Sequence, residues 1–150
     1  MGYELIDVET GADWVAYHSI RRQELFESRG RYGIYDEHYP GDHGPGKFHL
    51  LLKLDGEPIG TARLDIRDNG TAVFRLVAIT HTQQHRGHGR VMGGMIEERA
   101  RQSGTHTLFV NAAQEAHGFY RATGWDDYQW DRAELDGIAS SCIQMRKHLT

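Results

Sequence analysis

Alternating hydrophobic and polar residues mark most of the predicted strands of this chain. The first such stretch is YELIDV, at residues 3–8. Farther along, three longer runs are separated by the turn-forming pairs Asp55-Gly56 and Asn69-Gly70. Such pairs between strand-like runs are typical of tight hairpins, so the pattern predicts an antiparallel meander of three strands. The three runs are FHLLLKL, PIGTARLDIR and TAVFRLVAI.

Hydrophobic residues at helical spacing predict three helices. Residues 12–29 contain no helix breaker, place Trp14, Tyr17 and Leu25 at near-helical spacing, and stop at Gly30. The second helix lies in VMGGMIEERARQS and the third in AQEAHGFYRAT, and each is followed by a glycine that can end it. The stripe along the second helix consists of Met92, Met95, Ile96 and Arg99.

The rest of the chain supplies one long loop and three further strands. THTLFVN lies between the second and third helices, and WDDYQW and IASSCIQMRK form a closing strand pair. Residues 29–47 are rich in Gly, Pro, Asp, Tyr and His and show no period, so we expect a long loop with room for a short helix. Loops of this length are usually functional or mobile. The order of elements predicts an α/β fold with a mixed sheet.

Composition narrows the class of protein. With 150 residues, of which 39% are hydrophobic and 25% charged, we expect one globular domain over residues 1–150. The formal net charge of −4 argues against nucleic acid as the main partner. No apolar run has the length of a membrane span, and MGYELIDVET lacks a signal-peptide pattern. Cys142 is the single cysteine, so we expect a cytoplasmic protein without a disulfide framework or membrane association.

The stretch QQHRGHGR, at residues 83–90, joins the last strand of the meander to the second helix. Glycines there let the backbone approach a ligand closely, and the free N–H groups of a helix start favour an anion. Arg86 and Arg90 add donors that suit phosphate. The spacing fits neither a P-loop nor a dinucleotide fingerprint, and close packing in a strand-to-helix turn is the alternative interpretation.

Histidines in and before this stretch raise the question of a metal. His81, His85 and His88 would share one face only if the segment were helical, and it is expected to be a turn. His38, Asp42 and His43 are ligand-type residues in the long loop, where polar residues are ordinary. We therefore expect no metal site.

Two motifs resemble the GNAT superfamily of N-acetyltransferases. Gln84-x-Arg86-Gly87-x-Gly89 is similar to the family's pyrophosphate-binding signature, Gln/Arg-x-x-Gly-x-Gly/Ala. NAAQEAHGFYRATGW, at residues 111–125, resembles the family's second block. The resemblance implies a GNAT fold: a mixed, mostly antiparallel sheet flanked by helices, in which the fourth and fifth strands splay apart to admit acyl-CoA.

The resemblance also implies site residues for acetyl-CoA as co-substrate. The pantetheine amides would pair with the backbone of Val77 and Ile79. Asn111, at the end of the fifth strand, would contact the pantetheine or the acyl group, although a strand-end turn is its other interpretation. The pyrophosphate would lie on Gln84, Arg86, Gly87, His88, Gly89 and Arg90.

The implied reaction is direct transfer of an acetyl group to a primary amine. Tyr120 matches the family's general acid, which protonates the departing thiolate, and its other interpretation is a core aromatic beside Phe119. Where many members carry a glutamate on the fourth strand as general base, this chain has Arg75. The candidates for a base are Asp65, His49 and His81, and the absence of a base is the remaining alternative.

The acceptor amine is not identified by the motifs. In the family, the segment after the first helix usually forms one wall of the acceptor site, which can receive a small molecule or a protein amine. Here this segment carries carboxylates that would attract a cationic amine, and tyrosines that would pack on its carbon frame; a solvated loop is the alternative. These residues are Asp36, Glu37, Asp42, Tyr32, Tyr35 and Tyr39.

Two alternatives concern the whole protein. The closing strands resemble those of small bacterial members that often dimerise, so a homodimer is one expected state. A non-catalytic acyl-CoA-binding sensor or regulator of the same fold is the alternative to an enzyme, because the fourth-strand carboxylate is missing.

Overall fold

A computed structural model describes residues 2–150 and contains one seven-stranded sheet with the order β1-β2-β3-β4-β5-β7-β6. Neighbouring strands are antiparallel except β4 and β5, which are parallel. The strands are β1 Tyr3–Asp7, β2 Lys47–Leu54, β3 Glu57–Ile66, β4 Thr71–Ile79, β5 Thr107–Ala112, β6 Asp126–Asp127 and β7 Ile143–His148. The α-helices are α1 Gly11–Leu25, α2 His88–Gln102 and α3 His117–Ala122. Short 3-10 helices are η1 Glu27–Arg29, η2 Pro40–Asp42, η3 His81–Gln83, η4 Gln114–Ala116, η5 Arg132–Glu134 and η6 Gly137–Ser141.

The predicted meander is confirmed as β2, β3 and β4. At the first hairpin, Asp55 and Gly56 both have positive φ, of 51° and 86°. This backbone shape matches the twist of the flanking strands, which is why an Asp-Gly pair predicts a two-residue hairpin. The mixed α/β sheet expected from the order of elements is confirmed as well.

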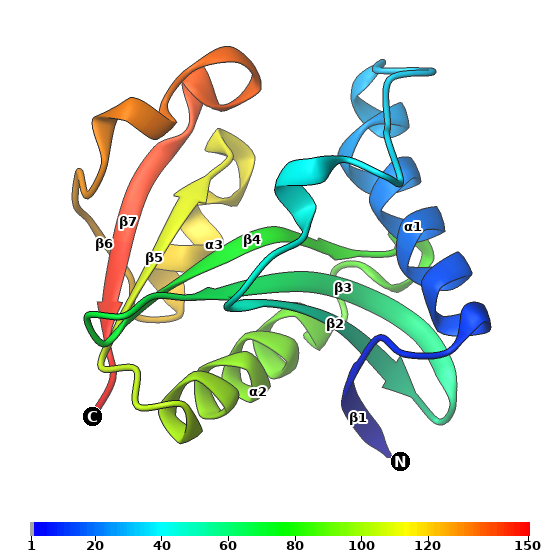
Figure 1. Cartoon of the computed structure of the whole chain (residues 1–150), viewed down its shortest axis with the longest axis horizontal. Helices are drawn as coiled ribbons and strands as arrows, with labels where there is room; N and C mark the ends of the chain where they lie inside the picture. Colours follow the sequence, from blue (N-terminus) through cyan, green and yellow to red (C-terminus); the bar gives the residue numbers. More distant parts are fainter. Residues whose placement is uncertain (1) are drawn as a thin grey trace.

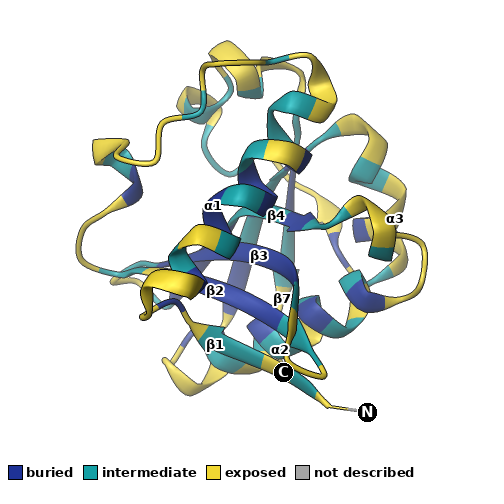
Figure 2. Ribbon diagram, turned by 90° about the vertical axis from the view of Figure 1, so that its right-hand side faces the viewer, coloured by how far each residue is buried: buried dark blue, intermediate teal, exposed yellow. Residues whose placement is uncertain are grey.

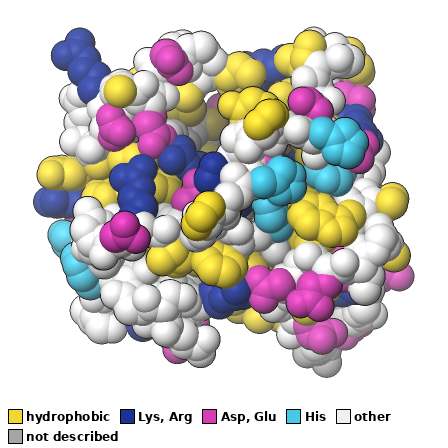
Figure 3. Space-filling view, viewed as in Figure 1, with side chains coloured by type: hydrophobic (Ala, Val, Ile, Leu, Met, Phe, Trp, Pro, Cys, Tyr) yellow, Lys and Arg dark blue, Asp and Glu magenta, His cyan; other side chains and the backbone are white. Residues whose placement is uncertain are grey.

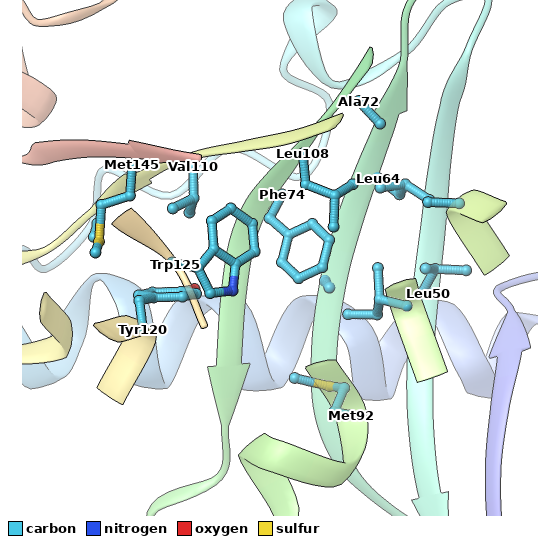
Figure 4. Close-up of a cluster of buried hydrophobic side chains, with 14 of the residues drawn as sticks. Leu50, Leu64, Ala72, Phe74, Met92, Leu108, Val110, Tyr120, Trp125 and Met145 are labelled. Carbon is cyan, nitrogen blue, oxygen red and sulfur yellow. The ribbon is translucent and has the colours of Figure 1, made fainter. Parts of the chain in front are cut away.

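The helices cover both faces of the sheet (Figure 1). α2 and α3 lie on one face and enclose the larger core, where Phe74, Leu108 and Trp125 meet (Figure 4). α1 crosses the other face, and Tyr17 and Ile20 pack there against Leu51 of β2. The central strands are accordingly buried, whereas the outer surfaces of the helices are exposed (Figure 2).

The predicted first helix is too long. α1 starts at a Thr10 cap and ends at Leu25, since Phe26 departs from helical geometry at φ −122° and ψ −66°. The chain continues as the tighter η1 turn and stops at Gly30, which adopts left-handed backbone geometry at φ 76°.

The predicted closing strands are also too long. Residues 137–141 form η6 rather than strand, and β7 begins at Ile143, which pairs with Ala112 at the end of β5. A strand needs a partner, and β5 offers none beyond that residue. β6 is only two residues long, because the chain then bends and stacks Trp130 on Phe109 at 5.1 Å between ring centroids.

β4 and β5 splay apart, as expected. They pair from Thr71 to Phe74 of β4 and no farther. Beyond this point β4 carries a bulge, since its register on β3 shifts between the pairs Arg63–Arg75 and Thr61–Ala78. Leu76 in the bulge has φ 51°, an uncommon value for a residue other than glycine. Residues held in such strained backbone geometry cluster at functional sites. The bulge thus bends β4 away from β5 and opens the sheet.

No helix within residues 2–150 combines the length and the apolar character needed to cross a bilayer.

Candidate active site

Two adjoining cavities, which share lining residues, occupy the opening between β4 and β5. The larger cavity, of about 540 Å³, is lined by the end of β4, the turn at residues 83–90 and the ends of α1 and α3. The smaller cavity, of about 220 Å³, lies beside the β4 bulge and the end of β5. The residues that line both cavities are Leu25, Arg29, Val77, Ala116 and Tyr120. A ligand in one cavity can therefore meet a ligand in the other at this junction.

The turn before α2 forms one end of the larger cavity. Gly87 caps α2 in left-handed geometry at φ 86°, and the first turn of the helix contains no acidic residue among those described. The N–H groups of this first turn have no intrahelical partner, so they and the helix dipole favour an anion here. The residues of the turn that line the cavity are Gln83, Gln84, His85, Gly87, Gly89 and Arg90.

Three residues of this turn are placed differently from the expectation. The Gln84 amide donates to the Ile79 carbonyl at 2.8 Å and so holds the turn against β4. The buried His88 side chain packs on β1, where its Nδ1 lies 2.6 Å from the Tyr3 hydroxyl, so only its backbone belongs to the turn. Arg86 is exposed and lies outside the cavity lining.

The end of β4 offers backbone groups to the larger cavity. The Thr80 N–H donates to the Ile59 carbonyl of β3 at 2.9 Å. Because successive residues of a strand direct their backbone N–H and C=O groups to opposite sides, those of Val77 and Ile79 point away from β3. β5 does not reach these residues, because it leaves β4 after Phe74. Val77 and Ile79 thus form a strand edge that β5 leaves unpaired, although the Ile79 carbonyl already accepts from the Gln84 amide.

Tyr120 lies at the junction of the two cavities. Its side chain is 7% exposed and packs edge-on against Trp125 and Phe119, with ring centroids 5.4 and 5.5 Å away (Figure 4). Burial raises the pKa of Tyr120 well above its usual value of 10, so the hydroxyl keeps its proton at neutral pH. The residue is therefore a core aromatic with a neutral hydroxyl, and it lines both cavities.

Asn111 lines the smaller cavity, but both ends of its amide are engaged. The amide nitrogen donates to Glu134 at 2.9 Å, and the oxygen accepts from Gln144 at 2.9 Å. Asn111 thereby fastens the segment around η5 to β5 and β7.

The three candidate bases and Arg75 are all engaged with other side chains of the protein. Asp65 accepts from Arg63 at 2.8 Å and from Arg75 at 3.2 Å, and Arg75 continues to Glu134. His49 Nδ1 lies 2.8 Å from the Tyr17 hydroxyl, and burial lowers its pKa. His81 contacts the Glu24 carboxylate at 2.9 Å. Within residues 2–150, none of these three bases lines either cavity.

The carboxylates of the long loop are also engaged within the protein. Buried Asp42 accepts from Arg21 at 2.8 and 3.0 Å and from Arg63 at 2.7 Å. Burial alone would raise the pKa of Asp42, but the two guanidinium groups hold it well below its usual range. Glu37 pairs with Arg22 at 2.8 Å, and Asp36 accepts from the His38 N–H.

The tyrosines of the loop lie outside both cavity linings too. The Tyr35 hydroxyl lies 2.5 Å from His18 Nδ1, and Tyr32 and Tyr39 are exposed. Histidine and aromatic side chains gather on this side of the molecule, over α1 and the loop (Figure 3). The loop is thus fastened to α1, and these carboxylates and tyrosines do not line the cavities.

Glu24 is a site residue that the sequence analysis missed. Its carboxylate, 6% exposed, accepts from the backbone N–H and the ring of His81, at 3.0 and 2.9 Å, and borders the larger cavity. It ties the end of α1 to the segment that leads into the turn. Its position four residues after buried Ile20 places it on the inward stripe of α1, a signal that could have found it.

Arg29 and Arg31 were missed as well. Arg29 borders both cavities and pairs with Glu115 at 2.9 Å, while Arg31 borders the smaller one. They follow α1 in the long loop, where no periodic pattern distinguishes an inward side chain. The described residues contain no group of three His, Cys, Asp or Glu side chains placed to hold a metal ion.

Known proteins resemble this chain in sequence and in fold. Residues 14–125 match the model of the acetyltransferase (GNAT) family. An uncharacterised N-acetyltransferase of Lactobacillus delbrueckii subsp. lactis, from the pepI 3′ region, is 31% identical over an alignment of 91 residues that covers 53% of this chain and 52% of that protein. The chain thus spans about half of the length of this curated relative.

Two solved structures share the fold. The PaiA N-acetyltransferase of Thermoplasma acidophilum, in complex with coenzyme A, has a TM-score of 0.72 at 16% identity and covers 99% of this chain and 100% of its own. N-acetylglutamate synthase of Neisseria gonorrhoeae, complexed with coenzyme A and N-acetyl-glutamate, has a TM-score of 0.78 at 16% identity. It covers all of this chain, which corresponds to 36% of that enzyme.

Proposed function

The chain belongs to the acetyltransferase (GNAT) family, whose general chemistry is acyl transfer, and from this premise we propose that it is an acetyl-CoA-dependent N-acetyltransferase acting on a primary amine. The observation that carries the proposal is the pair of cavities that meet at Val77 and Tyr120. The larger cavity would receive acetyl-CoA, and the smaller cavity, which shares these lining residues, would receive the acceptor.

Acetyl-CoA would occupy the larger cavity. Its pyrophosphate would lie on the first turn of α2, beside Gly87, Gly89 and Arg90, where N–H groups and positive charge meet. The pantetheine amides would pair with the open edge at Val77 and Ile79. The thioester would then lie at the junction, next to Tyr120.

The reaction would be a direct transfer between the two cavities. The amine nitrogen attacks the thioester carbon, and a backbone N–H near Ile79 stabilises the negative charge that forms on oxygen. The carbon–sulfur bond then breaks, and Tyr120 donates its proton to the departing thiolate. The acceptor nitrogen has meanwhile lost a proton to water, from which Tyr120 regains its own.

A protein base is not required by this scheme. Asp65 and Glu134 both form ion pairs with arginines. Burial alone would raise the pKa of Glu134, but the Arg75 guanidinium keeps the pKa of that carboxyl below its usual range. We therefore propose that the amine enters already neutral, and that kcat/KM rises with pH until the free amine is deprotonated. We also propose a cytoplasmic location, which suits a chain with one unpaired cysteine, Cys142. Homodimer formation stays a prediction.

Thermal unfolding with ligands, followed by an assay of thiol release, tests the proposal. We expect acetyl-CoA and CoA to raise the melting temperature, and NAD and ATP to raise it little. Ligand at 100 times its Kd stabilises by about 2.7 kcal/mol, which is a readily measured shift. No shift at millimolar acetyl-CoA would overturn the proposal. A shift without thiol release from a broad panel of amines would favour the sensor instead.

A further inference from the structure

The smaller cavity combines an apolar surface with two cationic side chains. Its lining includes the apolar side chains of Phe26, Leu76 and Ile138, and its charged members are Arg29 and Arg31. We infer that the acceptor is an amino carboxylate, namely an amino acid with an apolar side chain, whose carboxylate contacts Arg31. This inference rests on the proposed function and names the substrate class of the same site.

The charges of the cavity favour an anionic group on the acceptor. Arg29 already pairs with Glu115, so part of its charge is neutralised. Within residues 2–150, Arg31 has no carboxylate at ion-pair distance, and its side chain is only partly exposed. A guanidinium in this position offers a planar pair of donors that matches a carboxylate.

The two arginines differ in their place along the cavity. Arg31 lines only the smaller cavity, whereas Arg29 lines both cavities and so lies at their junction. An acceptor whose carboxylate contacts Arg31 would therefore have its amine free to point toward Val77 and Tyr120.

The remaining walls favour an apolar side chain. The positive φ of Leu76 places this residue at the cavity wall, and Phe26 and Ile138 come from the two segments that flank it. Ile138 is 59% exposed, a large apolar surface that a bound side chain would cover. A volume of about 220 Å³ is roughly seven times that of one water in the liquid, which suits a free amino acid.

The same features disfavour a polycationic acceptor. The loop carboxylates Asp36, Glu37 and Asp42, which would attract such an amine, are bound to groups of the protein itself. A polyamine in the smaller cavity would meet Arg29 and Arg31 instead. Like charges at close range oppose binding.

Matched acceptors in a thiol-release assay on the full chain test the inference. The probes are leucine, leucinamide, which lacks the carboxylate, and glutamate, which lacks the apolar side chain; spermidine is the polycation. We expect kcat/KM for leucine to exceed that for each of the others by about tenfold or more, a typical value for a charged hydrogen bond. Equal or faster acetylation of leucinamide or spermidine would overturn the inference.

Arg31→Gln adds the residue-level test. We expect kcat/KM for leucine to fall by about 10- to 100-fold, and the leucine-to-leucinamide ratio to approach one, while the acetyl-CoA-induced shift in melting temperature persists. Arg121→Gln, at an exposed arginine outside both cavities, is the matched control and should keep the ratio. An equal loss for both acceptors would refute the assigned contact.

The outcomes also separate the two proposals. If amines are acetylated without preference for a carboxylate, the inference is wrong and the proposed function stands. If no amine releases thiol although acetyl-CoA binds, both the enzymatic function and the assigned acceptor are wrong.

Discussion

The hydroxyl of Tyr120 can be tested separately from its ring. The ring packs against Phe119 and Trp125, and Tyr120→Phe keeps these contacts. We expect a melting temperature close to that of the wild type, an unchanged shift with acetyl-CoA, and turnover lower by about 100-fold, as for loss of a general acid. Thiol release under saturating substrates measures the effect.

The raised pKa of Tyr120 predicts how the rate of the wild type depends on pH. Burial raises that pKa above 10, so the wild type keeps its acid protonated throughout the neutral and mildly alkaline range. Its rate should therefore not decline between pH 7 and about 9.5 through ionisation of Tyr120. Unchanged turnover in Tyr120→Phe would leave this residue with a packing role alone.

A substitution at Gly89 is a better test of whether the backbone of the turn lies against the pyrophosphate than a substitution at Gly87. Gly87 has φ 86°, so any side chain there strains the turn even without a ligand. A Cβ added at Gly89 would lie 3.5 Å from the Phe119 ring, an ordinary contact, and it would border the larger cavity. Alanine also favours the helix, by up to about 1 kcal/mol.

For Gly89→Ala we therefore expect an equal or higher melting temperature and a smaller acetyl-CoA-induced shift. Gly94→Ala is the control, because this exposed position on α2 lies outside the cavity and a Cβ there meets no neighbour within 4 Å. It should raise stability and keep the full ligand shift. Equal ligand shifts in the two variants would show that the turn does not bind the pyrophosphate.

At the scale of elements, the buried ion pairs of Asp42 hold the long loop against α1 and β3. Arg21 comes from α1 and Arg63 from β3, and the Asp42 side chain is 3% exposed. Asp42→Ala leaves the buried Arg21 without its carboxylate, while Arg63 keeps Asp65, so we expect a loss of about 3–5 kcal/mol in the free energy of unfolding. Urea denaturation, followed by tryptophan fluorescence, measures the change.

Glu37 supplies the matched comparison within the same loop. Its pair with Arg22 is exposed, with side-chain exposures of 48% and 37%. Glu37→Ala should therefore cost about 0–1 kcal/mol. If Asp42→Ala were as mild, the buried network could not be what fastens the loop.

The elements also show which features a sequence pattern can predict. Hairpins, the turn before α2 and the helical stripes depend on neighbouring residues, and they were predictable. The partners of Asn111 lie 23 and 33 residues away, and Asp42 meets arginines 21 residues away on either side. Local spacing carries no information about such contacts. These side chains were therefore predicted as candidate ligand-binding groups, whereas in the structure they bind other side chains of the protein.

On the scale of the whole molecule, the two layers on either face of the sheet respond differently to acid. The face covered by α1 holds a cluster of histidines and aromatic rings, in which Trp14 stacks on His18 at 5.5 Å and lies 5.2 Å from His49. Figure 3 shows histidine and aromatic side chains together on this face. The opposite layer is the apolar core beneath α2 and α3.

Burial lowers the pKa of both His18 and His49 below their usual value of 6.5. The unfolded chain therefore binds these protons at a higher pH than the folded chain does, and folding stability falls as the pH drops through 6.5 toward the lowered values. We expect a lower melting temperature at pH 5.5 than at pH 7.5. A folded His49→Gln variant should lose less stability over the same interval. A wild-type melting temperature that is flat across this interval would mean that both rings accept protons within the cluster without cost, and that the loop and α1 reorganise around them.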